Sequence, residues 1–198
     1  MNLFNPLFLR KFAYYYKPIN FLMSTITIKD KTFKVFINSQ EIDQQISNVA
    51  SRINSDYKDK SPIFLGVLNG SFMFASDLYK KINVESEISF VKLASYSGTE
   101  TTGDVKKLIG LNENLKGKDI IILEDIVDTG ITISKLVDEL NELQVNSIKI
   151  ATLLLKPEAY KKEIPIDYSC FKIPNNFVVG YGLDYDGLGR NFPDIYSL

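Results

Sequence analysis

Three carboxylates and two threonines stand within nine residues near the middle of the chain. Glu124 and Asp125 follow a run of apolar residues, Asp128 comes three positions later, and Thr129-Gly130-Ile131-Thr132 follows at once. Carboxylates accept hydrogen bonds from sugar hydroxyls and bind hard cations. A glycine-containing turn with hydroxyl groups, placed at the start of a helix, suits an anion such as phosphate. The spacing therefore predicts a site that holds a sugar phosphate by its hydroxyls and its phosphate together.

Each half of this pattern also has a simpler interpretation. Asp128 or Thr129 can merely cap the helix that follows, as such residues commonly do. Glu124 and Asp125 can form a solvated acidic turn at the end of a strand. The two halves together are more specific, because a carboxylate pair beside apolar residues is costly unless a positive or hydroxylated group meets it. The stretch lacks the glycines and the lysine of a Walker loop, which argues against an NTPase.

The composition limits the chemistry that is available. The 198 residues include no histidine, so neither a Ser-His-Asp triad nor a histidine zinc site can form. Acid–base work near neutral pH falls to carboxylate, lysine or tyrosine, and the expected metal is a hard cation, with Mg²⁺ as the default. The formal net charge of −1 argues against a nucleic-acid binder. The single cysteine, Cys170, excludes an internal disulfide, and its neighbours predict a buried thiol rather than a nucleophile.

Strand and helix patterns alternate along the chain, which predicts an α/β domain with a central, mainly parallel sheet flanked by helices. Strands are expected over residues 33–37, 62–68, 87–94, 107–111, 119–123, 147–155, 168–171 and 177–179. The first helix is expected to begin with Ser39 as its N-cap. The apolar faces of the three helices are expected to contain Ile42, Ile46, Val49 and Ile53; Met73, Leu78 and Ile82; and Ile133, Leu136, Val137, Leu140 and Leu143.

The residues with chemical potential follow the expected strands. Asn69-Gly70, the segment 124–132, and Lys156 each stand at or just after a strand. Because parallel strands end at the same edge of a sheet, and ligands bind in the crevice there, these residues are expected to converge on one site.

The first 22 residues differ from the rest of the chain. They are dense in aromatic residues and carry Arg10, Lys11 and Lys17 but no acid. No uncharged run there approaches the length of a membrane span, and the segment lacks the features of a secretory signal. We therefore expect residues 1–22 to be an extension or an over-called start, a folded domain over residues 23–198 that begins near Met23, and a cytoplasmic protein that contacts no membrane.

The stretch Leu123-Glu124-Asp125-Ile126-Val127-Asp128-Thr129-Gly130 resembles the phosphoribosyl-pyrophosphate motif of the type I phosphoribosyltransferases. Residues 67–74, 95–98, 154–157 and 173–185 more closely resemble those of the hypoxanthine (hypoxanthine–guanine) phosphoribosyltransferases. The resemblance runs from about residue 33 to the C-terminus and excludes the first 22 residues. It implies the type I fold, with a small hood built from the N- and C-terminal segments, and a homodimer or homotetramer.

The resemblance also implies roles for the central motif. Glu124 and Asp125 would hold the ribose hydroxyls and the Mg²⁺ shell. Asp128 would be the general base that takes the proton from purine N7. The 5′-phosphate would be cradled by Thr129, Gly130, Ile131 and Thr132.

Residues outside that motif receive roles in the same way. Lys156 would donate to the 6-oxo group, Phe177 would stack on the purine ring, and the Val178 backbone would read the purine edge. Asp184 would help to place a second Mg²⁺, and Arg190 would contact pyrophosphate. Asn69 and Gly70 would present backbone N–H groups to pyrophosphate. Ser95 and Tyr96 would begin a lid that closes over the reacting centre.

These roles imply a purine salvage transferase that makes IMP, and GMP, from the free base and phosphoribosyl pyrophosphate. A second hypothesis is a regulatory protein of the same fold that senses such ligands, which the net charge and the lack of a second domain oppose. A third is a transferase for xanthine or adenine. Lys156 and the segment 177–184 favour a 6-oxopurine over adenine, whereas the ranking among 6-oxopurines stays open. One departure is Asn69, where many relatives have a lysine that would add positive charge near pyrophosphate.

Overall fold

The structure is a computed structural model that describes residues 24–92 and 115–198. The predictions for residues 1–22, for Ser95 and Tyr96, and for a strand at 107–111 lie outside the described residues, as does the end of the strand expected at 87–94.

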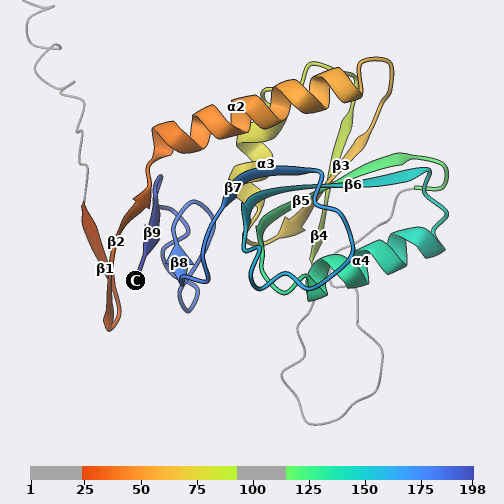
Figure 1. The fold of residues 1–198 in the computed structure, drawn as a ribbon. Coiled ribbons are helices and arrows are strands. Elements are labelled where there is room, and N and C mark those ends of the chain that lie inside the picture. Colours follow the sequence, from red (N-terminus) through yellow and green to blue (C-terminus); the bar gives the residue numbers. More distant parts are fainter. Residues whose placement is uncertain (1–23, 93–114) are drawn as a thin grey trace, which may run out of the picture.

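A five-stranded parallel sheet forms the centre of the molecule (Figure 1). Its strands lie in the order β4-β3-β5-β6-β7, and every neighbouring pair is parallel. This confirms the predicted α/β class. The strand bounds are β3 (Ile63–Leu68), β4 (Glu87–Lys92), β5 (Asp119–Val127), β6 (Ser147–Leu155) and β7 (Tyr168–Lys172).

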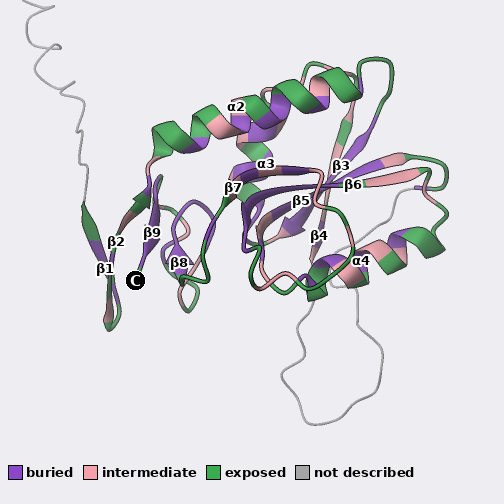
Figure 2. Ribbon diagram, in the orientation of Figure 1, coloured by how far each residue is buried: buried purple, intermediate pink, exposed green. Residues whose placement is uncertain are grey.

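Helices cover both faces of this sheet, and each face has its own core. Ile121 and Leu123 of β5 pack in the core that contains residues of α2 (Ser39–Asp56) and α3 (Phe72–Tyr79). Ile120 and Ile122 pack in the core that contains residues of α4 (Ile131–Glu142). Successive side chains of a strand point to opposite faces, so an apolar run without alternation is what a strand covered on both faces requires. Figure 2 shows the result, with buried central strands and exposed outer helix faces.

A second, smaller sheet joins the two ends of the described chain. It is antiparallel and has the order β1-β2-β9-β8. Its strands are β1 (Thr25–Ile28), β2 (Lys31–Ile37), β9 (Ile195–Ser197) and β8 (Val178–Val179). Its own core contains Ile26, Ile28, Phe33, Val179 and Tyr196. The expected hood from N- and C-terminal segments is therefore present.

Helix α2 begins one residue earlier than the sequence predicted. The N-cap is Asn38 and not Ser39, because Asn38 forms a capping box with Glu41. The Asn38 side chain accepts the Glu41 N–H at 2.9 Å, and the Glu41 carboxylate accepts the Asn38 N–H at 3.1 Å. The Ser39 N–H donates instead to Asp194, at 2.7 Å.

Three further predictions of element limits were wrong. Strand β5 does not end at Leu123 but continues through Glu124 and Asp125 to Val127, because β6 pairs with it as far as Val127. Ile82 and Leu143 lie beyond the ends of α3 and α4, and Leu143 is 37% exposed.

Among the described residues, no helix is both long and apolar enough to cross a membrane.

These helix limits lead to a stability prediction. Leu140 lies on the buried face of α4 and is fully buried, whereas Leu143 follows the helix and is 37% exposed. Leu140→Ala should lower the free energy of unfolding by about 2–5 kcal/mol, because it leaves a cavity in the core. The matched change Leu143→Ala should cost less than about 1 kcal/mol. Urea denaturation of both variants measures the difference, and equal losses would contradict the described packing.

Candidate active site

Three of the predicted site residues directly follow strands of the parallel sheet, whose strands β3, β5 and β6 lie side by side (Figure 1). Asn69 follows the last residue of β3, Asp128 follows the last residue of β5, and Lys156 follows the last residue of β6. The peptide bond between Leu68 and Asn69 is cis. In the β5–β6 register Val127 lies opposite Leu155, so the side chains of Asp128 and Lys156 leave neighbouring strands side by side.

Asp128 and Lys156 form an ion pair. Lys156 Nζ donates to Asp128 Oδ2 at 2.9 Å, and the Lys156 N–H donates to the Val127 carbonyl at 2.9 Å. The Lys156 side chain is only 11% exposed, whereas Asp128 is 47% exposed. Lys156 is therefore not a solvated strand end. Its nearly buried charge is matched by a carboxylate that remains open to an incoming ligand.

Glu124 is buried and Asp125 is partly buried, so neither carboxylate lies on a solvated turn. Burial raises the pKa of Glu124 well above its ordinary value, and the neighbouring charge of Asp125 raises it further. Glu124 Oε2 is buried and has no hydrogen-bond partner among the described residues. Burial also raises the pKa of Asp125, although its Oδ1 accepts the Ile126 N–H at 2.9 Å. A buried oxygen without a partner is costly, which indicates a place for a hydroxyl group or a cation.

Two glycines allow the backbone to close around Asp125. A Cβ on Gly70 would lie 1.5 Å from Asp125 Oδ2, and a Cβ on Gly182 would lie 2.1 Å from the Gly70 carbonyl oxygen. Gly182 also has a φ of +98°, which favours glycine. The turn after β3, the carboxylate of β5 and the C-terminal loop therefore touch one another, although they are far apart in the sequence.

Arg190 fixes the C-terminal loop at this contact. Its Nη1 donates to the Gly182 carbonyl at 2.7 Å, and its Nη2 pairs with Asp184 Oδ1 at 2.6 Å. Asp184 Oδ2 accepts the Gly187 N–H at 2.7 Å. The positive charge of Arg190 also offsets part of the rise in the Asp125 pKa. The structure thus brings Arg190 and Asp184 into one assembly with Gly70 and Asp125.

The start of α4 forms an open anion cradle. The N-cap is Gly130, with a φ of +80°, and no side chain of the described residues caps the helix. The alternative in which Asp128 or Thr129 caps this helix is therefore wrong. A pocket of about 70 Å³ lies here and is lined by Glu124, Ile126, Val127, Asp128, Thr129, Gly130, Ile131, Thr132 and Ile133. Free N–H groups, the positive end of the helix dipole and the exposed hydroxyls of Thr129 and Thr132 suit a phosphate.

Phe177 and Val178 lie at the small sheet. Phe177 is 44% exposed, which leaves area for a flat ligand. Val178 begins β8, where it is buried and pairs with Ser197.

Cys170 is buried as predicted, and burial raises the pKa of its thiol to about 12, so it remains a protonated structural residue at neutral pH.

Sequence reasoning missed three residues that shape this site. Gly182 contacts the Gly70 carbonyl, the Tyr160 ring packs on Gly130, where a Cβ would lie 2.4 Å from it, and Tyr185 packs on Phe177 at 5.8 Å between ring centroids. The repeated glycines from 180 to 189 were a visible signal of special backbone geometry. The partners of Gly182 and Tyr160 were not visible, because their contacts with Gly70 and Gly130 join distant parts of the chain.

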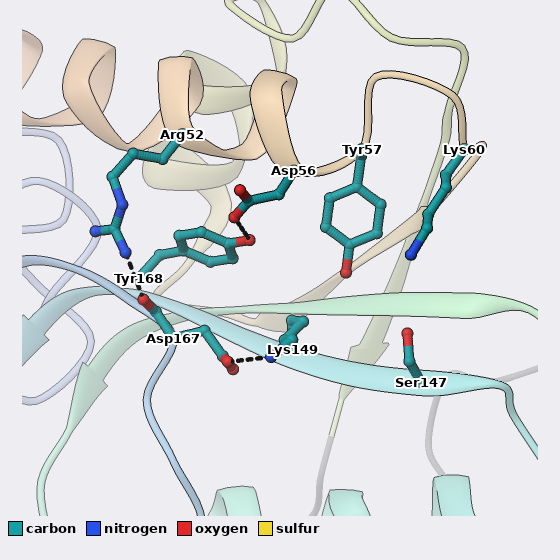
Figure 3. Close-up of a pocket in the computed structure, with 8 residues that line it drawn as sticks. All are labelled: Arg52, Asp56, Tyr57, Lys60, Ser147, Lys149, Asp167 and Tyr168. Atoms are coloured by element: carbon teal, nitrogen blue, oxygen red, sulfur yellow. Dashed lines mark hydrogen bonds and ion pairs between the residues drawn. The ribbon is translucent and has the colours of Figure 1, made fainter.

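A larger hollow, of about 410 Å³, lies at the opposite edge of the sheet (Figure 3). It is formed by the end of α2 and the amino ends of β6 and β7. Several of its polar side chains already have partners within it. Lys149 pairs with Asp167 at 2.7 Å, Tyr168 donates to Asp56 at 2.7 Å, and Arg52 donates to the Asp167 carbonyl at 3.0 Å. The carboxyl edge, with its partnerless Glu124 oxygen, is therefore the better candidate.

Comparison with known proteins identifies the family to which the chain is similar. A family model described as the phosphoribosyl transferase domain matches residues 37–186. The hypoxanthine-guanine phosphoribosyltransferase of Streptococcus pyogenes is 42% identical over 161 residues, which cover 81% of this chain and 89% of that protein. The enzyme of the same name from Streptococcus mutans is 41% identical over 172 residues, which cover 83% of this chain and 96% of that protein.

Solved structures give the same result. A hypoxanthine-guanine phosphoribosyltransferase from Bacillus anthracis superposes with a TM-score of 0.77 and 37% identity, covering 83% of this chain and 98% of that chain. A hypoxanthine phosphoribosyltransferase from Staphylococcus aureus has a TM-score of 0.77 and 40% identity, with 83% and 90% covered. The sheet order, the hood and the extent of these matches lead to one conclusion: the chain belongs to the phosphoribosyl transferase domain family and has the type I phosphoribosyltransferase fold.

Proposed function

We propose that the protein is a purine salvage enzyme that transfers the phosphoribosyl group of phosphoribosyl pyrophosphate to a 6-oxopurine. It makes IMP from hypoxanthine and GMP from guanine, and releases pyrophosphate. The names of the similar proteins support this reaction. The observation that carries it for this chain is the Asp128–Lys156 pair at the carboxyl edge, beside the open start of α4.

The paired charges match one edge of a 6-oxopurine. On that edge the O6 atom accepts a hydrogen bond, and the neighbouring N7–H group donates one. Lys156 supplies a donor and Asp128 supplies an acceptor, and their atoms already lie 2.9 Å apart. The base therefore replaces one contact with two. Adenine carries an amino donor in place of O6 and would meet the Lys156 ammonium with a group of the wrong kind.

The remaining groups hold the sugar and the leaving group. Thr129, Gly130, Ile131 and Thr132 bind the 5′-phosphate at the start of α4. Glu124 and Asp125 accept hydrogen bonds from the ribose hydroxyls, which gives the buried Glu124 Oε2 a partner. Backbone N–H groups of Asn69 and Gly70, with Arg190, bind pyrophosphate. Asparagine at position 69 leaves this subsite without the positive charge of a lysine.

Glu124 and Asp125 would also hold one Mg²⁺, and Asp184 would help to place a second. Among the described residues no three acidic or cysteine side chains converge to form a metal cage. This arrangement suits Mg²⁺, which is usually held by one or two carboxylates together with substrate phosphates. The unpartnered oxygen of Glu124 is a suitable hard donor for it. Asp184 keeps lone pairs beyond its contacts with Arg190 and Gly187. Bound Mg²⁺ supplies neutralisation of the charge that develops on pyrophosphate.

In the reaction, the bond from ribose C1 to pyrophosphate breaks and a bond from C1 to purine N9 forms. Asp128 accepts the proton that leaves N7, which a carboxylate can do without histidine. Lys156 holds O6 and stabilises negative charge as it develops on the base. The exposed ring of Phe177 stacks on the purine, and the Val178 backbone reads its edge.

The context of the enzyme is also a proposal. We propose a cytoplasmic homodimer or homotetramer whose functional core is residues 23–198, with residues 1–22 dispensable. Size-exclusion chromatography with light scattering measures the assembly, and mass spectrometry of the natural protein shows where it begins. A natural protein that contains residues 2–10 would contradict the proposed start.

An assay with purified protein, Mg²⁺, phosphoribosyl pyrophosphate and each of hypoxanthine, guanine, xanthine and adenine tests the function. Hypoxanthine and guanine should be converted. The kcat/KM for adenine should be at least about 100-fold lower than that for hypoxanthine, because Lys156 would face the amino group of adenine, which is a donor. Turnover should stop when a chelator removes the metal and return with added Mg²⁺. Comparable use of adenine would contradict the assigned role of Lys156, and no conversion of any base would refute the enzyme.

Asp128→Asn tests the general base. The amide keeps the shape of the side chain but cannot accept the N7 proton, so kcat should fall by about 10²–10⁴-fold. Affinity for IMP, measured by calorimetry, should change by only a few-fold. Asp138→Asn, on the exposed side of α4, is the matched control and should behave like wild type. Unchanged turnover of Asp128→Asn would show that another group accepts the proton.

A further inference from the structure

Three aromatic rings form a cluster at the hood, which we call the aromatic wall: Phe33, Phe177 and Tyr185. Their ring centroids are 6.2 Å apart for Phe33–Phe177, 6.2 Å for Phe33–Tyr185, and 5.8 Å for Phe177–Tyr185, which meet edge to face. Phe33 is fully buried in β2, whereas Phe177 keeps 44% of its surface exposed. The wall thus has a buried side against β2 and an open area on Phe177.

Lys31 places one positive charge over two rings of this wall. Its Nζ lies 4.6 Å from the centroid of Tyr185 and 5.5 Å from that of Phe177. Lys31 and Phe33 are two residues apart in β2, so their side chains leave the same face of the strand. Lys31 is partly buried, and a cation that is partly removed from water is attracted more strongly to the faces of aromatic rings.

The two residues before Lys31 bind the same loop. Asp30 accepts a hydrogen bond from the Tyr185 hydroxyl at 2.9 Å, and Lys29 forms an ion pair with Asp186. Three consecutive residues, the two of the β1–β2 turn and the first of β2, therefore contact residues 185 and 186. The contacts of Lys29 and Asp30 are exposed, and exposed pairs each contribute little to stability. Lys31, partly buried and shared between two rings, is the residue expected to matter most.

We infer that Lys31 is a positioning residue for the purine base. Its ammonium holds Phe177 and Tyr185 in the arrangement that leaves the open area of Phe177 facing the base. This inference rests on the proposed function, in which Phe177 stacks on the purine. Lys29, Asp30 and Lys31 precede residue 37, where the match to the family model begins, so that match assigns them no role. Neither the phosphate cradle nor the pyrophosphate contacts involve them, so the effect should be confined to the base.

Lys31→Met tests this inference, because methionine keeps an unbranched apolar stem and removes the charge. The KM for hypoxanthine should rise about threefold to tenfold, while the KM for phosphoribosyl pyrophosphate and kcat should stay within about twofold of wild type. Lys31→Arg keeps a cation over the rings and should restore most of the affinity. Lys34→Met, at an exposed position of the same strand, is the matched control and should change neither constant.

Several results would overturn the inference. An unchanged KM for hypoxanthine would show that the cation does not position the wall, and a lower one would show that Lys31 covers the face that the base needs. Equal rises in both Michaelis constants, with a lowered melting temperature, would reveal a general structural role. These failures require an active wild-type enzyme. A wild-type protein that converts no purine would refute the proposed function, and this inference with it.

Discussion

The rest of the site depends on two adjacent carboxylates that β5 carries into the interior of the protein. β6 pairs with β5 beyond Glu124 and Asp125, so neither side chain can leave the fold at a solvated turn. The Asp125 carboxylate leaves no room for a Cβ at position 70. The Gly70 carbonyl in turn leaves no room for a Cβ at position 182. Arg190 holds the Gly182 carbonyl in turn. These contacts join three distant segments, and Glu124 Oε2 has no hydrogen-bond partner among the described residues.

The free protein satisfies the remaining charges of the site internally. Lys156 lies against Asp128, and Asp184 lies against Arg190. Such pairs keep a nearly buried lysine and a partly buried arginine from standing alone, which would be strongly destabilising. The proposed substrates offer each of these groups a replacement partner: O6 and N7 of the base for the first pair, and pyrophosphate for Arg190. The two sheets divide this work, because the parallel sheet carries the reacting groups and the hood carries the aromatic wall.

Local features made much of this predictable from the sequence. The limits of β6 were correct because its apolar run is ended by Lys156-Pro157, and the motif from Glu124 to Thr132 pointed to the candidate site. The features that the sequence did not predict depend mainly on contacts between distant segments. Two acids normally signal the end of a strand, but pairing with β6 carries β5 past them. The contact of Gly182 with Gly70, and of Lys31 with Phe177, joins residues more than 100 positions apart and depends on topology. Asn38 was the exception, since Glu41 three residues later already marked the capping box.

The melting temperature of the ligand-free Glu124→Gln variant, followed against pH, tests most directly whether the buried carboxylate is held at a cost for a ligand. Burial raises the pKa of Glu124 well above its ordinary value of 4.5, so wild-type stability should decrease as the pH rises from 4.5 toward the pKa of the folded state. Glutamine does not titrate. The variant should therefore melt at a higher temperature than wild type at about pH 8, and this advantage should shrink as the pH approaches 4.5. A variant that is less stable than wild type at about pH 8, or a difference that does not vary with pH, would contradict the account.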